Sequence, residues 1–165
     1  MPILQPYSLE FLSRSAEQTR RVGMRLGTLV QTGDVICLLG ELGSGKTTLV
    51  QGLAGGWGSL DTVTSPTFVL VNVYRRPNGQ NMFHLDAYRL SGPLEAEDLD
   101  ILTMLDHGPL IVEWADRIQA ALPGENMWIN LNWIGEEQRD MLITAHGLRY
   151  QGLLQDLRKQ VFGVS

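Results

Sequence analysis

One short segment, Gly40–Thr47, carries the residue types that bind a polyphosphate. It reads Gly-Glu-Leu-Gly-Ser-Gly-Lys-Thr and matches the pattern G-x-x-x-x-G-K-S/T at every fixed position. Glycines allow tight turns, so that successive backbone N–H groups point at the phosphate oxygens. Lys46 adds a positive charge, and the Thr47 hydroxyl suits a Mg²⁺ ion that bridges the outer phosphates. The candidate nucleotide contacts are therefore Gly40, Glu41, Leu42, Gly43, Ser44, Gly45, Lys46, Thr47 and Thr48.

The residues on both sides of this loop fit a strand that enters it and a helix that leaves it. Val35–Leu39 is a short, wholly apolar run that includes β-branched residues, as in a buried parallel strand. After the loop, apolar residues recur at helical spacing: Leu49, Val50, Leu53, Ala54 and Trp57. Such a helix points the positive end of its dipole at the phosphate. Because strand, loop and helix agree, a glycine-rich turn with an accidental lysine is the weaker interpretation.

Two carboxylates at expected strand ends are candidates for binding the metal and orienting water. Leu110–Glu113 is an apolar strand that ends in an acid, the arrangement that places a Walker B carboxylate beside magnesium. Asp86 shares a strand face with His84, and an aspartate at a strand end can bind Mg²⁺ directly or through water. The alternatives are a surface ion pair for Glu113 and a helix cap for Asp86. Trp114 follows as either a core aromatic or a wall of the nucleotide pocket.

The elements around the loop predict an α/β fold. Ahead of it we expect an edge strand near residues 7–11, then a helix capped by Ser15, with Gln18 reaching back, and ended by Gly33. Beyond it, residues 68–74 and 81–85 flank a Pro-Asn-Gly turn and predict an antiparallel hairpin. The polar segment 59–67 is either a switch-like loop near the phosphate or a solvated connector.

The second half of the chain completes the expected sheet. It predicts a helix over 93–102, the strand 110–113, a short helix over 116–122, strands 127–134 and 139–145 around a Gly135-Glu136 turn, and a last helix over 148–162. The expected fold class is α/β, a P-loop NTPase-like three-layer sandwich with a mixed, largely parallel central sheet that includes an antiparallel hairpin. With 165 residues, we expect a single P-loop domain over 1–165.

Composition narrows the classes of function. The chain is 44% hydrophobic and 19% charged, with no apolar run long enough for a membrane span and no visible signal peptide, so we expect a cytoplasmic protein. Cys37, its single cysteine, lies in the apolar strand and fits a small buried hydrophobe. A net charge of -5 without a basic cluster disfavours strong autonomous binding to nucleic acid.

The nucleotide is better interpreted as ATP than as GTP. No Asn-Lys-x-Asp segment for reading guanine occurs, and residues 106–109 lack the glycine of a D-x-x-G switch. A small-molecule kinase is a third possibility, but such kinases use an arginine-rich lid, whereas Arg89, Arg117 and Arg139 are scattered singly. Hydrolysis of ATP, or switching driven by ATP binding, fits better.

Four segments in order resemble the bacterial TsaE family, also called YjeE. They are Gly-Glu-Leu-Gly-Ser-Gly-Lys-Thr-Thr at 40–48, Thr-Ser-Pro-Thr-Phe at 64–68, His-Leu-Asp-Ala-Tyr-Arg-Leu at 84–90 and Val-Glu-Trp-Ala at 112–115. The resemblance implies a Mg²⁺-dependent P-loop ATPase that works with TsaB, TsaC and TsaD. Together they place threonylcarbamoyl on the adenosine beside the anticodon of tRNAs that read codons starting with A. It also implies docking on TsaB and TsaD, with tRNA reached only through these partners and no membrane.

The resemblance also assigns roles by position. Lys46 and the loop amides would hold phosphates, with Lys46, Asp86 and Glu113 as the catalytic set, and Thr47, Asp86 and Glu113 would hold the metal. Trp114 would lie near the nucleotide, with Thr19 and Arg139 as weaker nucleotide contacts, and residues 65–67 would sit in a switch-like loop. One departure is Val73, where the family often has an acid. Three activities stay open: an ATPase that is slow without partners, an assembly module with little turnover, and a small-molecule kinase.

Overall fold

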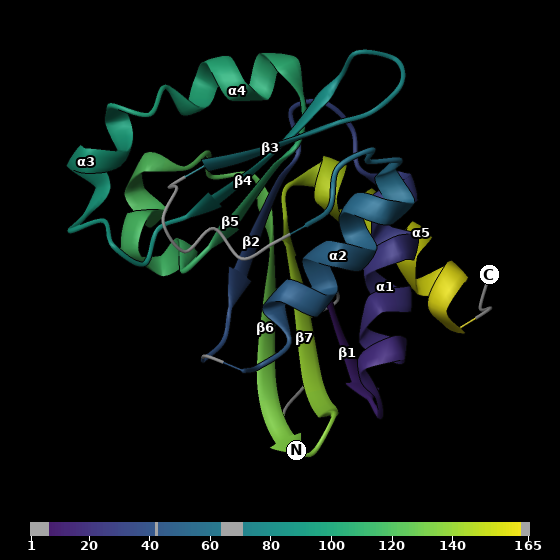
Figure 1. The fold of residues 1–165 in the computed structure, drawn as a ribbon. Helices are drawn as coiled ribbons and strands as arrows, with labels where there is room; N and C mark the ends of the chain where they lie inside the picture. The colour runs from purple at the N-terminus through teal and green to yellow at the C-terminus, as the bar shows by residue number, and fades with distance from the viewer. Residues whose placement is uncertain (1–6, 42, 64–70, 163–165) are drawn as a thin grey trace.

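A mixed seven-stranded sheet forms the centre of the protein, and the strands run through the middle of Figure 1. The computed structural model describes residues 7–41, 43–63 and 71–162. The strands are β1 Ser8–Ser13, β2 Val35–Leu39, β3 Val71–Arg75, β4 Asn81–Asp86, β5 Leu110–Glu113, β6 Asn126–Gly135 and β7 Gln138–His146. Their order across the sheet is β1-β7-β6-β2-β5-β4-β3.

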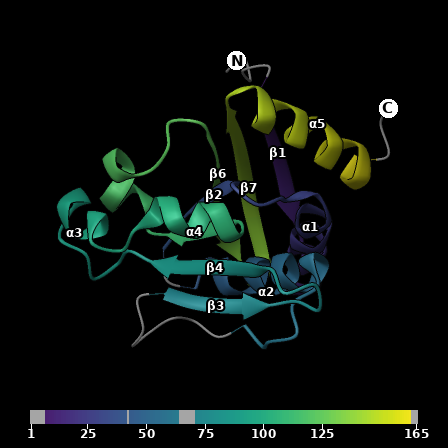
Figure 2. The same cartoon turned by 90° about the horizontal axis from the view of Figure 1, so that it is seen from above.

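The parallel strands occupy the middle of this sheet. β6, β2, β5 and β4 pair in parallel, whereas β1–β7, β7–β6 and β4–β3 pair antiparallel. Figure 2 shows β3 and β4 side by side at one edge, as the hairpin prediction required. All strands except β3 and β7 therefore point in one direction, and the mixed, largely parallel sheet is confirmed.

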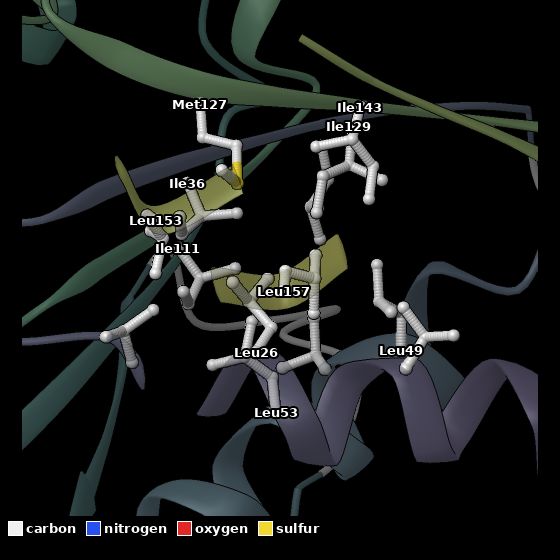
Figure 3. Packing of buried hydrophobic residues seen from close by; sticks show 14 of the residues in the cluster. Leu26, Ile36, Leu49, Leu53, Ile111, Met127, Ile129, Ile143, Leu153 and Leu157 are labelled. Atoms are coloured by element: carbon white, nitrogen blue, oxygen red, sulfur yellow. The ribbon is translucent and has the colours of Figure 1, made fainter. Parts of the chain in front are cut away.

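Helices cover both faces of the sheet and make three layers (Figure 1). One face is covered by α1 Ala16–Leu29, α2 Lys46–Trp57 and α5 Leu148–Phe162, and the other by α3 Pro93–Glu97, α4 Ile101–His107 and the 3-10 helix η1 Ala115–Ala121. Figure 3 shows the larger core, where Leu26 of α1 and Leu53 of α2 meet Ile36 of β2 and Leu157 of α5. Burial of each such side chain contributes roughly 1.5–3 kcal/mol.

The register of the central strands determines where the candidate carboxylates lie. Glu113 of β5 is level with Leu38 of β2 on one side and with Asp86 of β4 on the other. Because parallel strands end at the same edge of a sheet, both acids lie where β2 passes into the phosphate loop. The predicted strand ends at Asp86 and Glu113 are both correct.

The expected continuous helix over residues 93–102 is wrong. α3 ends at Glu97, and α4 begins after Asp100, whose φ of 53° lies in the left-handed region. Ala96 and Ile101 are both buried in the same hydrophobic cluster. On a straight helix, residues five apart point roughly 140° away from each other, so one helix could not bury both. The break between α3 and α4 lets both side chains reach the core.

The caps of α1 follow the sequence with one difference at each end. Ser15 Oγ accepts the Gln18 N–H at 3.1 Å, as predicted, but the Gln18 side chain accepts from the Arg14 N–H rather than from that of Ser15. The helix ends at Leu29 rather than at Gly33, because Val30 is already extended and its side chain is buried. The β6–β7 turn is likewise centred one residue later than expected, with Glu137 at φ 60°.

Glycines allow α1 and α2 to pack with their backbones in close approach. A Cβ on Gly52 would collide with the backbone carbonyl oxygen of Arg20, and one on Gly23 would collide with that of Leu49. Gly55, on the same helix as Gly52, is exposed and would have nothing within 4 Å of its Cβ. Helix α2, whose first turn follows the phosphate loop, is thus held in place by direct backbone contact with α1.

This contact predicts opposite effects for two glycine substitutions in α2. Gly52→Ala should lower the free energy of unfolding by about 1–3 kcal/mol or more, because its methyl group meets backbone that cannot rotate away. Gly55→Ala should raise it by up to about 1 kcal/mol, since alanine favours helix and meets no atom there. Urea denaturation of both variants measures the difference, and equal effects would show that the helices are not in close contact.

Candidate functional site

The phosphate-loop segment connects the end of β2 to the start of α2. Gly45 caps α2 in the left-handed region at φ 102° and accepts the Leu49 N–H at 2.9 Å. Gly40 has φ 150°, and a Cβ there would collide with the Ser44 side chain. Both positions therefore require glycine, as the motif predicts. Leu42 lies outside the described residues.

Lys46 is a buried cation at the centre of this loop. Lys46 is 6% exposed, and its Nζ donates to the Gly40 carbonyl oxygen. The same Nζ lies 4.0 Å from the centre of the Trp114 ring. Burial lowers the pKa of Lys46, whereas the charges of Glu113, Asp86 and Asp116 act to raise it. The loop thus encloses one cation surrounded by acids.

The two candidate carboxylates face the loop as neighbours. Asp86 Oδ1 accepts the Tyr88 N–H at 2.9 Å, and Glu113 is buried at 4% exposure. Burial raises the pKa of Asp86, and the charge of Glu113 raises it further, against the lowering effects of the Tyr88 N–H, His84 and Lys46. Neither acid has the fully exposed position expected of an ordinary surface ion pair.

A cavity of about 260 Å³ brings most of the predicted site residues together. It is lined by Gly43, Gly45, Lys46, Thr47, Thr48, Asp86, Glu113, Trp114 and Arg139. Trp114 thereby forms a wall of the pocket and also packs its ring against Tyr88 at 5.0 Å. Its φ of 57° is unusual for a bulky residue, and such strain persists where surrounding contacts enforce it.

Arg139 and Thr19 take different positions relative to this cavity. The Arg139 side chain comes from β7 and donates to the carbonyl oxygens of Gly43 at 3.0 Å and Gly135 at 3.0 Å. Thr19 is buried, with its hydroxyl 2.6 Å from that of Ser13, and is not among the residues that line the cavity. The structure therefore places Arg139 on the loop, and a nucleotide contact for Thr19 stays a prediction.

The residues of the cavity fit a nucleotide with a magnesium ion. Ser44 Oγ is buried and has no hydrogen-bond partner among the described residues, which leaves a donor free for a ligand in the loop. Thr47, Asp86 and Glu113 supply oxygen donors. Over residues 7–41, 43–63 and 71–162 there is no cluster of three or more His, Cys, Asp or Glu that would hold a metal alone. Mg²⁺ commonly uses one or two carboxylates and takes its remaining ligands from phosphate and water, and the Thr47, Asp86 and Glu113 oxygens suit such a site.

Sequence reasoning missed the partners that surround these residues. His84 contacts Glu113 at 2.6 Å and Tyr74 at 2.8 Å. The sequence indicated only that His84 shares a strand face with Asp86, and it did not predict either contact. A second cavity of about 510 Å³ adjoins the loop, with Gly40, Glu41 and Trp114 in its lining. Its remaining lining residues are Leu39, Asp116, Asn130, Leu131, Asn132 and Trp133. Only the alternation of Asn130 and Asn132 along β6 could have indicated a shared face.

Comparison with known proteins decides the family. The sequence pattern of "Threonylcarbamoyl adenosine biosynthesis protein TsaE" matches residues 13–141. The chain belongs to the TsaE family. It is 39% identical to the Streptomyces coelicolor TsaE protein, named "tRNA threonylcarbamoyladenosine biosynthesis protein TsaE", over 79% of this chain and 93% of that protein. It is 34% identical to the Bacillus subtilis protein of the same name, over 92% of this chain and 94% of that protein.

A solved structure supports the TsaE fold. The crystal structure of Bacillus subtilis YdiB superposes with a TM-score of 0.77 and 28% identity, covering 97% of this chain and 99% of that one. The P-loop NTPase-like sandwich and the family resemblance are thus confirmed. Of the TsaE-like segments, residues 64–68 and the switch-like part at 65–67 lie outside the described residues. Within the described ranges, no helix is both long and apolar enough to cross a membrane.

The raised pKa of Asp86 predicts a stability gain on neutralising it. Asp86→Asn keeps an acceptor for the Tyr88 N–H and removes a charge that burial disfavours, so its Tm should exceed that of the wild type above neutral pH. The gain should shrink as the pH falls through the folded-state pKa of Asp86, because the wild-type carboxyl is then neutral as well.

Asp61 is the matched control, with the opposite sign. Hydrogen bonds from Arg75 lower its pKa, so Asp61→Asn should lower the Tm above the ordinary aspartate pKa and lose this effect as acid protonates the wild type. Thermal melts of both variants across the pH range test the pair. A lower Tm for Asp86→Asn at neutral pH would contradict the electrostatic description of the site.

Proposed function

We propose that this TsaE protein binds ATP with Mg²⁺ in the phosphate-loop cavity and hydrolyses it in the biosynthesis of threonylcarbamoyladenosine in tRNA. The observation that carries the proposal is the meeting of Lys46, Thr47, Asp86 and Glu113 in one cavity. The names of the Streptomyces and Bacillus relatives support the pathway. The modified base would be the adenosine beside the anticodon in tRNAs that read A-starting codons, as the family resemblance implies.

The proposed roles follow from charge and position. The loop amides and Lys46 bind the outer phosphates, and the Thr47 hydroxyl binds the metal. Magnesium neutralises charge that develops on the transferred phosphoryl group. Glu113 orders the attacking water or the water shell of the metal, and Asp86 assists at the same oxygen-rich edge. Trp114 covers Lys46 and keeps bulk water away from its ammonium group.

Partners complete the proposed function. Arg139 is the arginine that lines the cavity within the described part of the chain. Its two terminal nitrogens already donate to carbonyl oxygens, whereas its buried Nε has no partner among the described residues. Because phosphoryl transfer commonly uses an arginine against transition-state charge, we expect slow hydrolysis alone and faster hydrolysis with partners. The family resemblance names TsaB and TsaD as the docking partners and TsaC as a further member of the pathway. An acidic chain suits contact with tRNA through these proteins, in the cytoplasm.

One observation favours a second candidate, an assembly module in which ATP acts as a conformational ligand. Lys46 Nζ is bonded to the Gly40 carbonyl and Arg139 to that of Gly43. The Lys46 ammonium group has three N–H donors, so a phosphate would share it with the Gly40 carbonyl or displace that carbonyl, and nucleotide binding would act on the loop through this lysine. In this alternative, assembly with the partners is the output and turnover is incidental.

Glu113→Gln separates the two candidates. If Glu113 orders metal or water, the variant should lose about 100-fold in ATP turnover while it still binds Mg-ATP, because glutamine preserves shape and an acceptor but not charge. Phosphate release is measured for both proteins alone and then with TsaB, TsaD and tRNA. Modification of the tRNA is measured in the same mixtures.

The ATPase, the assembly module and the kinase predict different results in these measurements. Stimulation of the wild type by partners, with loss of turnover and of tRNA modification in Glu113→Gln, supports the ATPase. Full tRNA modification by a variant that binds ATP without hydrolysing it supports the assembly module. Consumption of ATP that depends on an added small molecule and not on partners would indicate a kinase instead.

A further inference from the structure

Behind Glu113, three buried polar side chains form a line across the sheet. Tyr74 of β3, His84 of β4 and Glu113 of β5 come from adjacent strands and are 3%, 0% and 4% exposed. His84 Nε2 lies 2.6 Å from Glu113 Oε2, and His84 Nδ1 lies 2.8 Å from the Tyr74 hydroxyl. The line thus runs from the outer edge strand of the sheet to the wall of the phosphate-loop cavity.

One arrangement of protons gives each of these contacts a donor and an acceptor. An ionised carboxylate can only accept hydrogen bonds, so Nε2 of His84 must carry the proton that it shares with Glu113. When the ring carries a single proton, on Nε2, Nδ1 accepts from the Tyr74 hydroxyl, and the same phenol also has a side-chain hydrogen bond with Asn72. Burial raises the pKa of Tyr74, which keeps this hydroxyl protonated. Each polar group in the line therefore has a partner of the right kind.

The line restricts the Glu113 side chain at the place where its orientation matters. A glutamate has three side-chain torsions, and one at a cavity wall can point in several directions. The bond to His84 holds Oε2 and leaves Oε1 as the oxygen for a metal or a water. Groups that orient a metal-site ligand from behind in this way commonly change affinity or activity by about 10–100-fold.

We propose that His84 is a positioning residue that holds the Glu113 carboxylate in its working orientation, and that Tyr74 fixes the tautomer of His84. The proposal rests on the proposed function of Glu113. Removing one partner of a buried polar pair also lowers stability, so a purely structural role would change Tm without changing kcat per folded molecule. A positioning role would in addition lower kcat per folded molecule.

The first test uses the nucleotide-free protein and does not involve activity. Imidazole ¹⁵N NMR should show His84 with a protonated Nε2 and an unprotonated Nδ1. Tyr74→Phe removes one hydroxyl and should shift the Nδ1 resonance of His84. Tyr150→Phe is the matched control, because it removes another buried hydroxyl, the acceptor for the Val35 N–H at 2.9 Å, and should leave the His84 signals unchanged. A proton on Nδ1 in the wild type would overturn the proposal.

The second test measures ATP turnover with TsaB, TsaD and tRNA present. His84→Leu should lower kcat by about 10–100-fold while the Kd for a fluorescent ATP analogue stays within about twofold. His84→Gln should recover part of kcat, because its amide N–H can replace the Nε2 donor. Tyr74→Phe should lower kcat by a smaller factor, and Tyr150→Phe should leave kcat unchanged even if its Tm falls.

The two tests separate this proposal from the proposed function. Wild-type kcat in both His84 variants, per folded molecule, would show a structural role only and would overturn the proposal. If the wild type hydrolyses no ATP with or without partners, the ATPase function fails, and the NMR result alone decides. A fixed Nε2–H tautomer that responds to Tyr74→Phe but not to Tyr150→Phe then supports the line, and any other pattern overturns it.

Discussion

The parallel pairing of β5 with β2 and with β4 is the constraint on which the site depends. Side-by-side parallel strands that end together deliver Asp86 and Glu113 to the edge where β2 becomes the phosphate loop. A shift of one residue in either pairing would turn a carboxylate to the opposite face of the sheet. Burial of most apolar residues of these strands, in the clusters on both faces, opposes such a shift. The packing of the core therefore also determines where the two carboxylates lie.

The electrostatics of the cavity depend on the same arrangement. One buried ammonium group, that of Lys46, is surrounded by Glu113, Asp86 and Asp116, and its charge partly offsets theirs. Such a cluster is unfavourable for a bare protein, because burial disfavours the ionised acid at Asp86. A polyphosphate bound with Mg²⁺ would meet both signs of charge there, the phosphates at the lysine and the metal at the acids. A ligand that paired these charges would stabilise the folded state to which it binds.

Sequence predicted what depends on local spacing. The loop motif, the strand before it, the helix after it and helix α5 follow from short patterns, and the structure has α5 and β5 at the predicted residues. Local patterns did not predict features that depend on contacts with the rest of the fold. For example, α3 and α4 are separate helices because Ala96 and Ile101 both pack into one hydrophobic cluster. His84 illustrates the same limit in the site. Its strand face was predictable, but its contacts with Tyr74 and Glu113 depend on which strands are neighbours, and that order is not written in any local pattern.

The described loop is held by its own groups, and that bears on how a nucleotide would act. Lys46 is bonded to Gly40 and Arg139 to Gly43. Because the ammonium group has three N–H donors, a phosphate would either share Lys46 with the Gly40 carbonyl or replace that carbonyl. The Lys46–Gly40 bond already has a charged donor, and such bonds contribute about 1.5–3 kcal/mol, whereas a bond between Lys46 and a phosphate has charge on both partners. The difference favours the phosphate, but by much less than the full strength of a new bond. Phosphate binding at Lys46 would thus be linked directly to Gly40, at the end of the loop that follows β2.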